Sequence, residues 1–134
     1  MKLLIMGICL AVFILGVWSN ANAQCITVRV SVASDGTQGN NGLFTDSHPS
    51  ISADGRFVAF SSYASNLVSG DTNGYKDVFI HDLLTGLTTL VSVTSEGAQA
   101  NGRSTNPAIS GDGRYVAFVS WAPNLAPDDT YGFR

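Results

Sequence analysis

The sequence predicts an all-β protein built from four-stranded antiparallel units, and its 134 residues hold about one and a half of them. The first observation is an internal repeat: "ISADGRFVAF" begins at Ile51 and "ISGDGRYVAF" begins at Ile109, 58 positions later. Each copy also contains an Asp-Gly pair between two strand-like runs, which predicts a tight hairpin because glycine accepts a positive φ without steric cost. No segment keeps a helical period, so strands are expected throughout.

Residues 1–23 are predicted to be a secretory signal peptide and are set apart from the folded domain. Lys2 provides a positive start, Leu3–Trp18 is apolar, and the sequence Ala-Asn-Ala at 21–23 offers the small residues at which signal peptidase cleaves. The alternative is an uncleaved membrane anchor, but the run is shorter than the roughly 18 to 20 apolar residues that span a bilayer. The mature chain is therefore expected to begin at Gln24 and to be secreted or periplasmic.

Cys25 is the one cysteine expected in the exported chain, because Cys9 leaves with the signal peptide. Residues 22–24, Asn-Ala-Gln, lack the aliphatic and small residues that a lipoprotein signal places before its cysteine, which argues against lipidation. An odd cysteine in an exported chain can also pair with a partner outside it. The sequence leaves the free, paired and lipidated forms open.

Residues 47–95 are predicted to form one complete unit. Its four strand-like runs are Pro49–Ser52, Arg56–Phe60, Asp77–Asp82 and Leu87–Val93. The second run carries apolar side chains on both faces, which is typical of a strand that is buried on both sides. Short turns follow the first and third runs, and a long polar connection follows the second.

Incomplete units are predicted on either side of the complete one. The sequence "TVRVSV" within residues 24–35 matches "TTLVSV" of the fourth strand, so this segment is expected to be a closing outer strand. Residues 105–134 repeat only the first half of the unit. We therefore expect a fragment of a larger protein, with the missing units beyond Arg134 and an apolar sheet edge left at Tyr115–Val119.

The repeated residues follow a pattern of proline, Ser-x-Asp-Gly-Arg, Val-Ala-Phe and Asp-x-Phe-x-x-Asp. They are Pro49, Ser52–Arg56, Val58–Phe60 and Asp77–Asp82, and again Pro107, Ser110–Arg114 and Val116–Phe118. This pattern resembles the TolB-like β-propeller repeat, a WD-like repeat of exported bacterial proteins, although the Gly-His and Trp-Asp signatures of true WD repeats are lacking. The resemblance implies that residues 24–134 are a partial propeller whose units are blades around a central channel. It further implies binding of other proteins or carriage of an attached catalytic domain, and no particular reaction.

The long polar connections are the candidate binding region. Strand direction alternates within a unit, so residues 61–76 and 94–106, with the equivalent segment 33–48, are expected on one face, which we name the long-loop face. Loops carry function more often than scaffold strands do, so this face is predicted to bind a protein, a glycan or a small molecule. The alternative is that these segments are solvated connectors.

One loop of this face has the spacing of a calcium ligand set. Asp71, Asn73 and Asp77 occupy positions 1, 3 and 7, with a glycine at position 4, and could direct oxygen ligands at Ca²⁺. The acidic residue at position 12, Asp82, falls in the third strand, and Tyr131 replaces the asparagine in the second copy. Capping of a turn by the Asp and Asn side chains explains the same residues.

No catalytic constellation is recognisable in the sequence. His48 and His81 lack partners at a catalytic spacing, and the repeated Asp54 and Asp112 lie in tight turns. There is no Gly-x-Ser-x-Gly elbow, HExxH motif or phosphate-binding glycine loop. Ten acidic residues outnumber seven basic ones, for a net charge of −3, so nucleic acid is not an expected partner. The sequence has no second long apolar run, so no membrane contact is expected beyond the signal peptide.

The sequence thus favours a non-enzymatic, exported binding or scaffold module. Two alternatives remain open at this point. One is the propeller domain of a larger enzyme, such as a prolyl-oligopeptidase-like peptidase, and the other is a multi-blade structural surface protein. The ligand and the number of blades are not specified by these residues.

Export gives a direct test of the signal peptide. Because Ala-Asn-Ala closes the apolar run, the chain expressed from its complete sequence should reach the periplasm or the medium with Gln24 as its first residue. N-terminal sequencing of the exported protein measures this. An intact Met1 on protein held in the membrane fraction would contradict it.

Overall fold

The computed structural model describes residues 4–6, 26–41 and 48–126, which form strands and loops without a helix. The strands are β1 (Leu4–Met6), β2 (Thr27–Arg29), β3 (Ser50–Ile51), β4 (Phe57–Ser62), β5 (Asp77–Asp82), β6 (Thr88–Leu90), β7 (Ser104–Ile109) and β8 (Val116–Ser120). They make a four-stranded sheet, β3-β4-β5-β6, and two two-stranded sheets, β1-β2 and β7-β8. The prediction of an all-β protein is confirmed. In the described part of the chain, no helix has the length and hydrophobicity needed to cross a bilayer.

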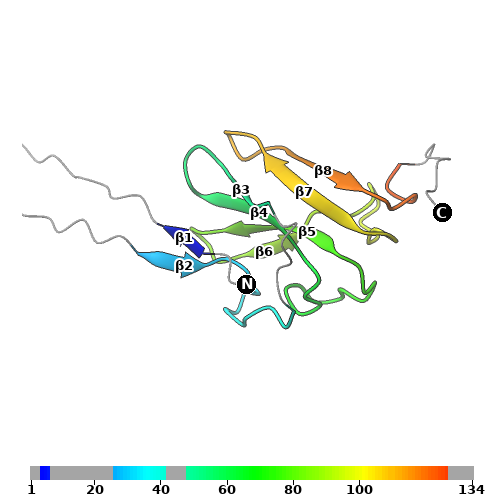
Figure 1. Cartoon of the computed structure of the whole chain (residues 1–134), viewed down its shortest axis with the longest axis horizontal. Helices are drawn as coiled ribbons and strands as arrows, with labels where there is room; N and C mark the ends of the chain where they lie inside the picture. The colour runs from blue at the N-terminus through cyan, green and yellow to red at the C-terminus, as the bar shows by residue number, and fades with distance from the viewer. Residues whose placement is uncertain (1–3, 7–25, 42–47, 127–134) are drawn as a thin grey trace, which may run out of the picture.

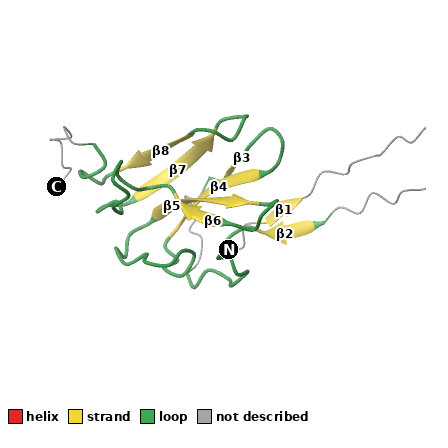
Figure 2. Cartoon of the chain, turned by 180° about the vertical axis from the view of Figure 1, so that it is seen from behind, coloured by secondary structure: helices red, strands yellow, loops and turns green. Residues whose placement is uncertain are grey.

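The sheet β3–β6, which we name the first unit, is an antiparallel meander in which each strand pairs with the next along the chain. β4 and β5 pair over their whole length, from Phe57 opposite Asp82 to Ser62 opposite Asp77. The β7–β8 pair, the second unit, repeats the β3–β4 hairpin and lies as a separate layer over the first unit (Figures 1 and 2). From β3 onward, the described strands therefore form one four-stranded unit followed by the first two strands of another.

The core of the first unit forms around two aromatic rings that face each other across β4 and β5. Phe60 and Phe79 are direct partners in the register, and their stacked rings lie 5.8 Å apart between centroids. Ala64 and Leu67, from the loop after β4, complete the buried cluster. Full burial of such a side chain stabilises the fold by about 1.5 to 3 kcal/mol.

β4 is buried on both faces, as predicted. Val58 and Phe60 point to one face and Ala59 to the other, and each is at most 1% exposed. The face of β4 that carries Ala59 is covered by the second unit, whose strand β7 lies across β4. The double burial explains why this strand reads as a nearly continuous apolar run.

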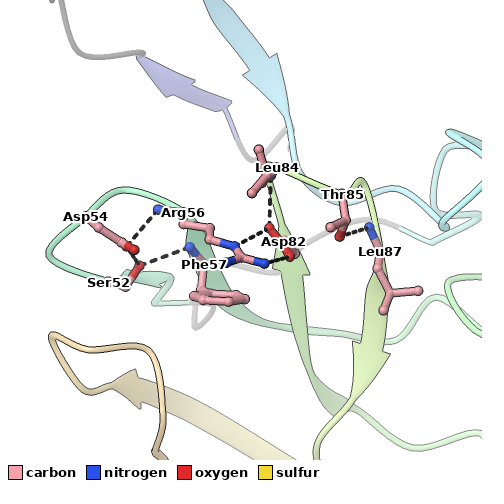
Figure 3. Close-up of polar contacts among 8 residues, drawn as sticks. All are labelled: Ser52, Asp54, Arg56, Phe57, Asp82, Leu84, Thr85 and Leu87. Atoms are coloured by element: carbon pink, nitrogen blue, oxygen red, sulfur yellow. Dashed lines mark hydrogen bonds and ion pairs between the residues drawn. The ribbon is translucent and has the colours of Figure 1, made fainter.

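The Asp-Gly turns form the same hydrogen-bonded structure in both units. In the first, the Asp54 carboxylate accepts a hydrogen bond from the Ser52 hydroxyl and another from the Arg56 amide, at 3.0 Å (Figure 3). Gly55 has a φ of 73°, a conformation that favours glycine. In the second unit Asp112 accepts the equivalent two hydrogen bonds. The hydrogen bond from the serine is the main cause that lowers the pKa of each of these carboxyls, so they are ionised turn residues.

An ion pair ties the two hairpin turns of the first unit together. The Arg56 guanidinium donates two hydrogen bonds to the Asp82 carboxylate, at 3.0 and 2.7 Å, and the Leu84 amide donates a third (Figure 3). The arginine partner holds the pKa of Asp82 far below its ordinary range. In the second unit the equivalent Arg114 lies over the Tyr115 ring, and no described carboxylate pairs with it.

Several strand boundaries differ from the predicted ones, and three of the differences are larger than one residue. β4 continues to Ser62 because β5 is long enough to pair with it. The fourth strand, β6, ends at Leu90, because Val93 instead forms a bridge with the following loop. β7 begins at Ser104, ahead of Pro107, and the register shifts between Thr105 and Ala108. Proline has no amide hydrogen to donate, so an irregular pairing at this point accommodates it.

The N-terminal pair β1–β2 was not predicted. β1 comes from the segment interpreted as a signal peptide, and its backbone pairs antiparallel with β2, Leu4 opposite Arg29 and Met6 opposite Thr27. β2 falls within the predicted closing strand, and among its described residues, 26–35, the strand covers 27–29. The other residues of 1–25, together with 42–47 and 127–134, lie outside the described residues, and so do the predicted cleavage site, Cys25 and parts of the predicted unit boundaries.

The Arg56–Asp82 pair predicts a pH-dependent stability. Because the pKa of Asp82 is lowered in the folded protein, the pair stabilises the fold above the ordinary aspartate pKa of about 4 and loses this effect as the pH falls toward the folded value. Arg56→Gln should therefore be less stable than the wild type at pH 7, by a margin that shrinks between pH 4 and pH 2. Urea unfolding at several pH values measures it.

Arg114→Gln is the matched control, because both arginines lie over the aromatic ring that follows them. A pH-independent loss of stability in Arg56→Gln, equal to that in Arg114→Gln, would show that stacking on the ring, and not the ion pair, is what the arginine contributes.

Candidate functional site

The long connections gather at the end of the molecule opposite the hairpin turns. The connection from β4 to β5 and the one from β6 to β7 lie toward this end, together with the described part of the segment after β2, whereas the β3–β4 and β7–β8 turns lie at the other (Figure 1). This is the arrangement that strand alternation predicts for the long-loop face. The segments 31–41 and 92–102, which we name the bridging loops, are equivalent to each other in sequence and in structure.

Each bridging loop folds on itself in the same way. Val32 forms an isolated bridge with Gln38 in the first loop, and Val93 forms one with Gln99 in the second. The closing backbone hydrogen bonds, Ala33 N to Thr37 O and Thr94 N to Ala98 O, are both 2.8 Å long. Since the two loops share this geometry, the repeat extends into the connections and is not confined to the strands.

An asparagine clamps each bridging loop to the unit that follows it. Asn66 accepts a hydrogen bond at Oδ1 from the Asn40 amide, at 2.8 Å, and donates one from Nδ2 to the Gln38 carbonyl, at 2.9 Å. Asn124 makes the equivalent pair with the Asn101 amide, at 3.0 Å, and the Gln99 carbonyl, at 2.8 Å. A side chain that satisfies one donor and one acceptor of the same loop fixes its position relative to the strands.

The three predicted calcium ligands lie together, but they bond to protein groups. Buried Asp77 accepts hydrogen bonds from the Ser92 hydroxyl, at 2.6 Å, and from Asn73 Nδ2, at 2.8 Å. The same Asn73 amide also donates to the Ala100 carbonyl, at 3.0 Å, and its Oδ1 accepts from the Tyr75 amide. These bonds support the alternative given by the sequence, a turn capped by its own Asp and Asn side chains.

Asp71 stands on the same side of this turn and faces the second bridging loop. Its carboxylate accepts a hydrogen bond from Gln99 Nε2, at 3.3 Å. Burial raises the pKa of Asp71, and burial together with the nearby Asp71 charge raises the pKa of Asp77. Two buried carboxylates that repel each other favour the binding of either a proton or a cation, because each of these reduces the negative charge. Among the described residues, however, no three His, Cys, Asp or Glu side chains converge as a metal site.

The histidines are both involved in structural contacts. His81 is buried and shares a 2.9 Å hydrogen bond with the Thr88 hydroxyl, and burial lowers its pKa, so the ring is neutral near pH 7. His48 Nδ1 lies 3.2 Å from Asn106 Oδ1, and these two residues occupy equivalent positions of adjacent units. Neither forms a catalytic arrangement with its described neighbours.

Among the described residues, the exposed surface of the long-loop face includes hydroxyl groups, amides, the carboxylates of Asp35 and Glu96, and the Tyr75 ring. Tyr75 is 46% exposed beside the exposed Thr72, and Asn40 and Asn101 are exposed on the two bridging loops. The sequence interpretation did not single out Tyr75, although an aromatic residue in a polar loop was the available signal. Tyrosine offers a rigid apolar surface with a polar tip, which suits recognition.

Comparisons with family models, with curated proteins and with solved structures each found no match. The propeller resemblance therefore rests on the repeated residues.

Calcium binding remains a prediction for the Asp71–Asp77 loop. Ca²⁺ would have to displace the hydrogen bonds of Asn73, so we expect weak binding that Asp71→Ala abolishes. Calorimetric titration of CaCl₂ into the purified chain measures it, with Asp35→Ala as a control for loss of a loop carboxylate. Absence of heat, or unchanged heat in Asp71→Ala, would leave the loop as a capped turn.

Proposed function

We propose that the chain is an exported β-propeller-type binding module, in which the repeated units are blades and the long-loop face receives a protein, glycan or small polar ligand. The observation that carries this proposal is the double hydrogen bond of Asn66, repeated by Asn124, between each unit and its bridging loop. A loop held in one geometry loses little conformational entropy when it binds, which is the main requirement for a pre-organised binding surface.

The chemistry of the exposed groups supports a polar ligand with an apolar patch. The Tyr75 ring provides a flat surface, and the exposed polar groups of the bridging loops provide donors and acceptors on the same face. Ligand sites commonly combine apolar or aromatic area with a few placed polar groups. The proposal is for binding and not for catalysis, because the repeated carboxylates Asp54 and Asp112 are engaged in their turns.

Screening against arrays of glycans and of peptides tests the proposal. Wild-type chain that is detected through an appended epitope tag should bind a subset of the array probes, and Tyr75→Ala should weaken this binding at least tenfold. Leu84→Ala is the matched control, because Leu84 is 75% exposed in the turn between β5 and β6, away from the long-loop face.

Binding that falls equally in Leu84→Ala and Tyr75→Ala would place the contact elsewhere and overturn the proposed face. Retention of no probe from either array would argue against the ligand classes named here.

A further inference from the structure

Strand β8 has one edge that no other described strand covers. It pairs with β7 alone among the described strands, and it lies on the side of β7 away from the first unit (Figures 1 and 2). The Tyr115 carbonyl and the Trp121 amide both bond to the chain at the ends of β7. Because backbone groups alternate in direction along a strand, those of Val116, Phe118 and Ser120 point the other way. We name this row of backbone groups the β8 edge.

In the first unit the equivalent edge is covered by β5. β4 corresponds to β8, and it pairs with β5 over its whole length. Phe60, which corresponds to Phe118, lies opposite Phe79, and their stacked rings form the centre of the core. Phe60 is 1% exposed, whereas Phe118 is partly exposed. Among the described residues, the second unit therefore lacks the strand and the aromatic side chain that complete the core of the first.

The turn next to this edge already has the conformation found in the complete unit. The Ala122 amide donates a hydrogen bond to the Ser120 hydroxyl, at 3.1 Å, as the Ala64 amide donates to the Ser62 hydroxyl, at 3.0 Å. Ala122 is buried, as Ala64 is. A surface held in the conformation that binding requires loses little conformational entropy when it binds. The β8 edge is therefore prepared to accept a strand.

The arginine beside the β8 edge lacks a described carboxylate like the one that its equivalent has. Arg56 donates two hydrogen bonds to Asp82, the last residue of β5, which lies opposite Phe57 (Figure 3). Arg114 corresponds to Arg56, and no described carboxylate pairs with it. A segment that paired with β8 as β5 pairs with β4 would place an acidic residue opposite Tyr115, beside the Arg114 guanidinium. The charge of this arginine therefore favours an acidic occupant.

These two requirements specify the chemistry of a strand that fits. In β5 the aromatic and the acidic residue, Phe79 and Asp82, are three positions apart, and the whole strand has the pattern Asp-x-Phe-x-x-Asp. Within the 134 residues this pattern occurs only in β5, which is already paired on both sides. The strand that fits the β8 edge is therefore not one of the described strands.

We propose that the β8 edge binds an extended segment of a partner protein, in which an aromatic residue packs on Phe118 and an acidic residue three positions later pairs with Arg114. The segment adds to β7–β8 as an antiparallel third strand. Backbone hydrogen bonds along the edge supply affinity, and the two side chains supply specificity. This site does not involve Tyr75, so it is independent of the ligand proposed for the long-loop face.

A synthetic peptide with the sequence of residues 76–83, Lys-Asp-Val-Phe-Ile-His-Asp-Leu, is the probe. Fluorescence anisotropy measures binding of the labelled peptide to the exported, purified chain. Phe79→Ala in the peptide should weaken binding by about tenfold or more, because the ring that packs on Phe118 is lost. The protein variant Tyr75→Ala should bind the peptide as the wild type does, which separates this result from that of the long-loop face.

Charge exchange tests the register of the added strand. Arg114→Asp should weaken binding of the wild-type peptide, and a peptide with Asp82→Arg should bind this variant more tightly than it binds the wild-type chain. Arg56→Gln is the matched control, because Arg56 is paired within the first unit, and it should leave peptide binding unchanged. If Arg56→Gln weakens binding and Arg114→Asp does not, the peptide displaces β5 and the proposal is overturned.

Methylation of single peptide nitrogens tests strand addition without changing the protein. The Val78 carbonyl and the Asp82 amide bond to the chain at the ends of β6, so the Phe79 amide faces β4. A peptide methylated at the Phe79 nitrogen should therefore lose binding to the β8 edge. Methylation at the Ile80 nitrogen, which faces away from that edge, should leave binding unchanged.

Three results would overturn the proposal. They are no binding of the unmodified peptide, as expected if the chain itself covers the β8 edge, equal binding of the two methylated peptides, and no rescue by charge exchange in a folded variant. Circular dichroism establishes that each variant keeps its β-sheet signal. If Arg114→Asp loses that signal, the methylated peptides decide the outcome, because they are measured on the wild-type chain.

Discussion

The structure depends on a strand that must be covered on two sides. β4 carries apolar residues on both faces. One layer packed on the sheet can cover only one of these faces, so a second layer is needed for the other. On one side, Ala64 and Leu67 fold over the Phe60 ring and the first bridging loop packs on them, so closely that a Cβ at Gly39 would lie 3.2 Å from Ala64 Cβ. On the other side, the second unit lies across the strand. Neither layer would bury its own apolar surface without the other.

The two ends of each unit have different physical properties. The turn end is closed by short-range bonds of Ser52 and Asp54, and one long-range ion pair, Arg56–Asp82, joins it to the next turn. The loop end is held by bonds between segments more than 20 residues apart, such as Asn66 to the first bridging loop. A turn stabilised within itself can repeat in every unit, whereas the loop end can vary its exposed residues while the asparagine keeps the loop in place.

The buried polar groups near the long-loop face combine structural and electrostatic roles. Asp77 is fully buried and accepts hydrogen bonds from Ser92 and Asn73, so that the start of β5 is fixed to the turn before it and to the bridging loop after β6. Neighbouring Lys76 is also buried, its ammonium lies 5.8 Å from the Tyr63 ring centroid, and burial lowers its pKa. Its carbonyl accepts a hydrogen bond from the Ser104 amide, at 2.7 Å, which connects the loop to β7. The same short segment therefore links both units and the loops between them.

Local sequence determined which runs between residues 49 and 93 become strands, their order along the chain and the hairpin turns. Alternation of side chains and the φ that glycine permits act within a few residues, so Asp54-Gly55 and the doubly apolar run at 57–60 could be interpreted from their own neighbours. The grouping of Asp71, Asn73 and Asp77 was also predictable, because they belong to one loop.

Tertiary structure decided which groups those side chains meet. The partner of Asn66 is 28 residues away and that of Arg56 is 26 residues away, and no local pattern specifies such a pairing. The end of β6 at Leu90, the pairing of β1 with β2 and the exposure of Tyr75 likewise depend on neighbouring layers. A residue's own neighbours set the backbone conformation that it favours, whereas its burial and hydrogen-bond partners are set by segments that only the folded chain brings close.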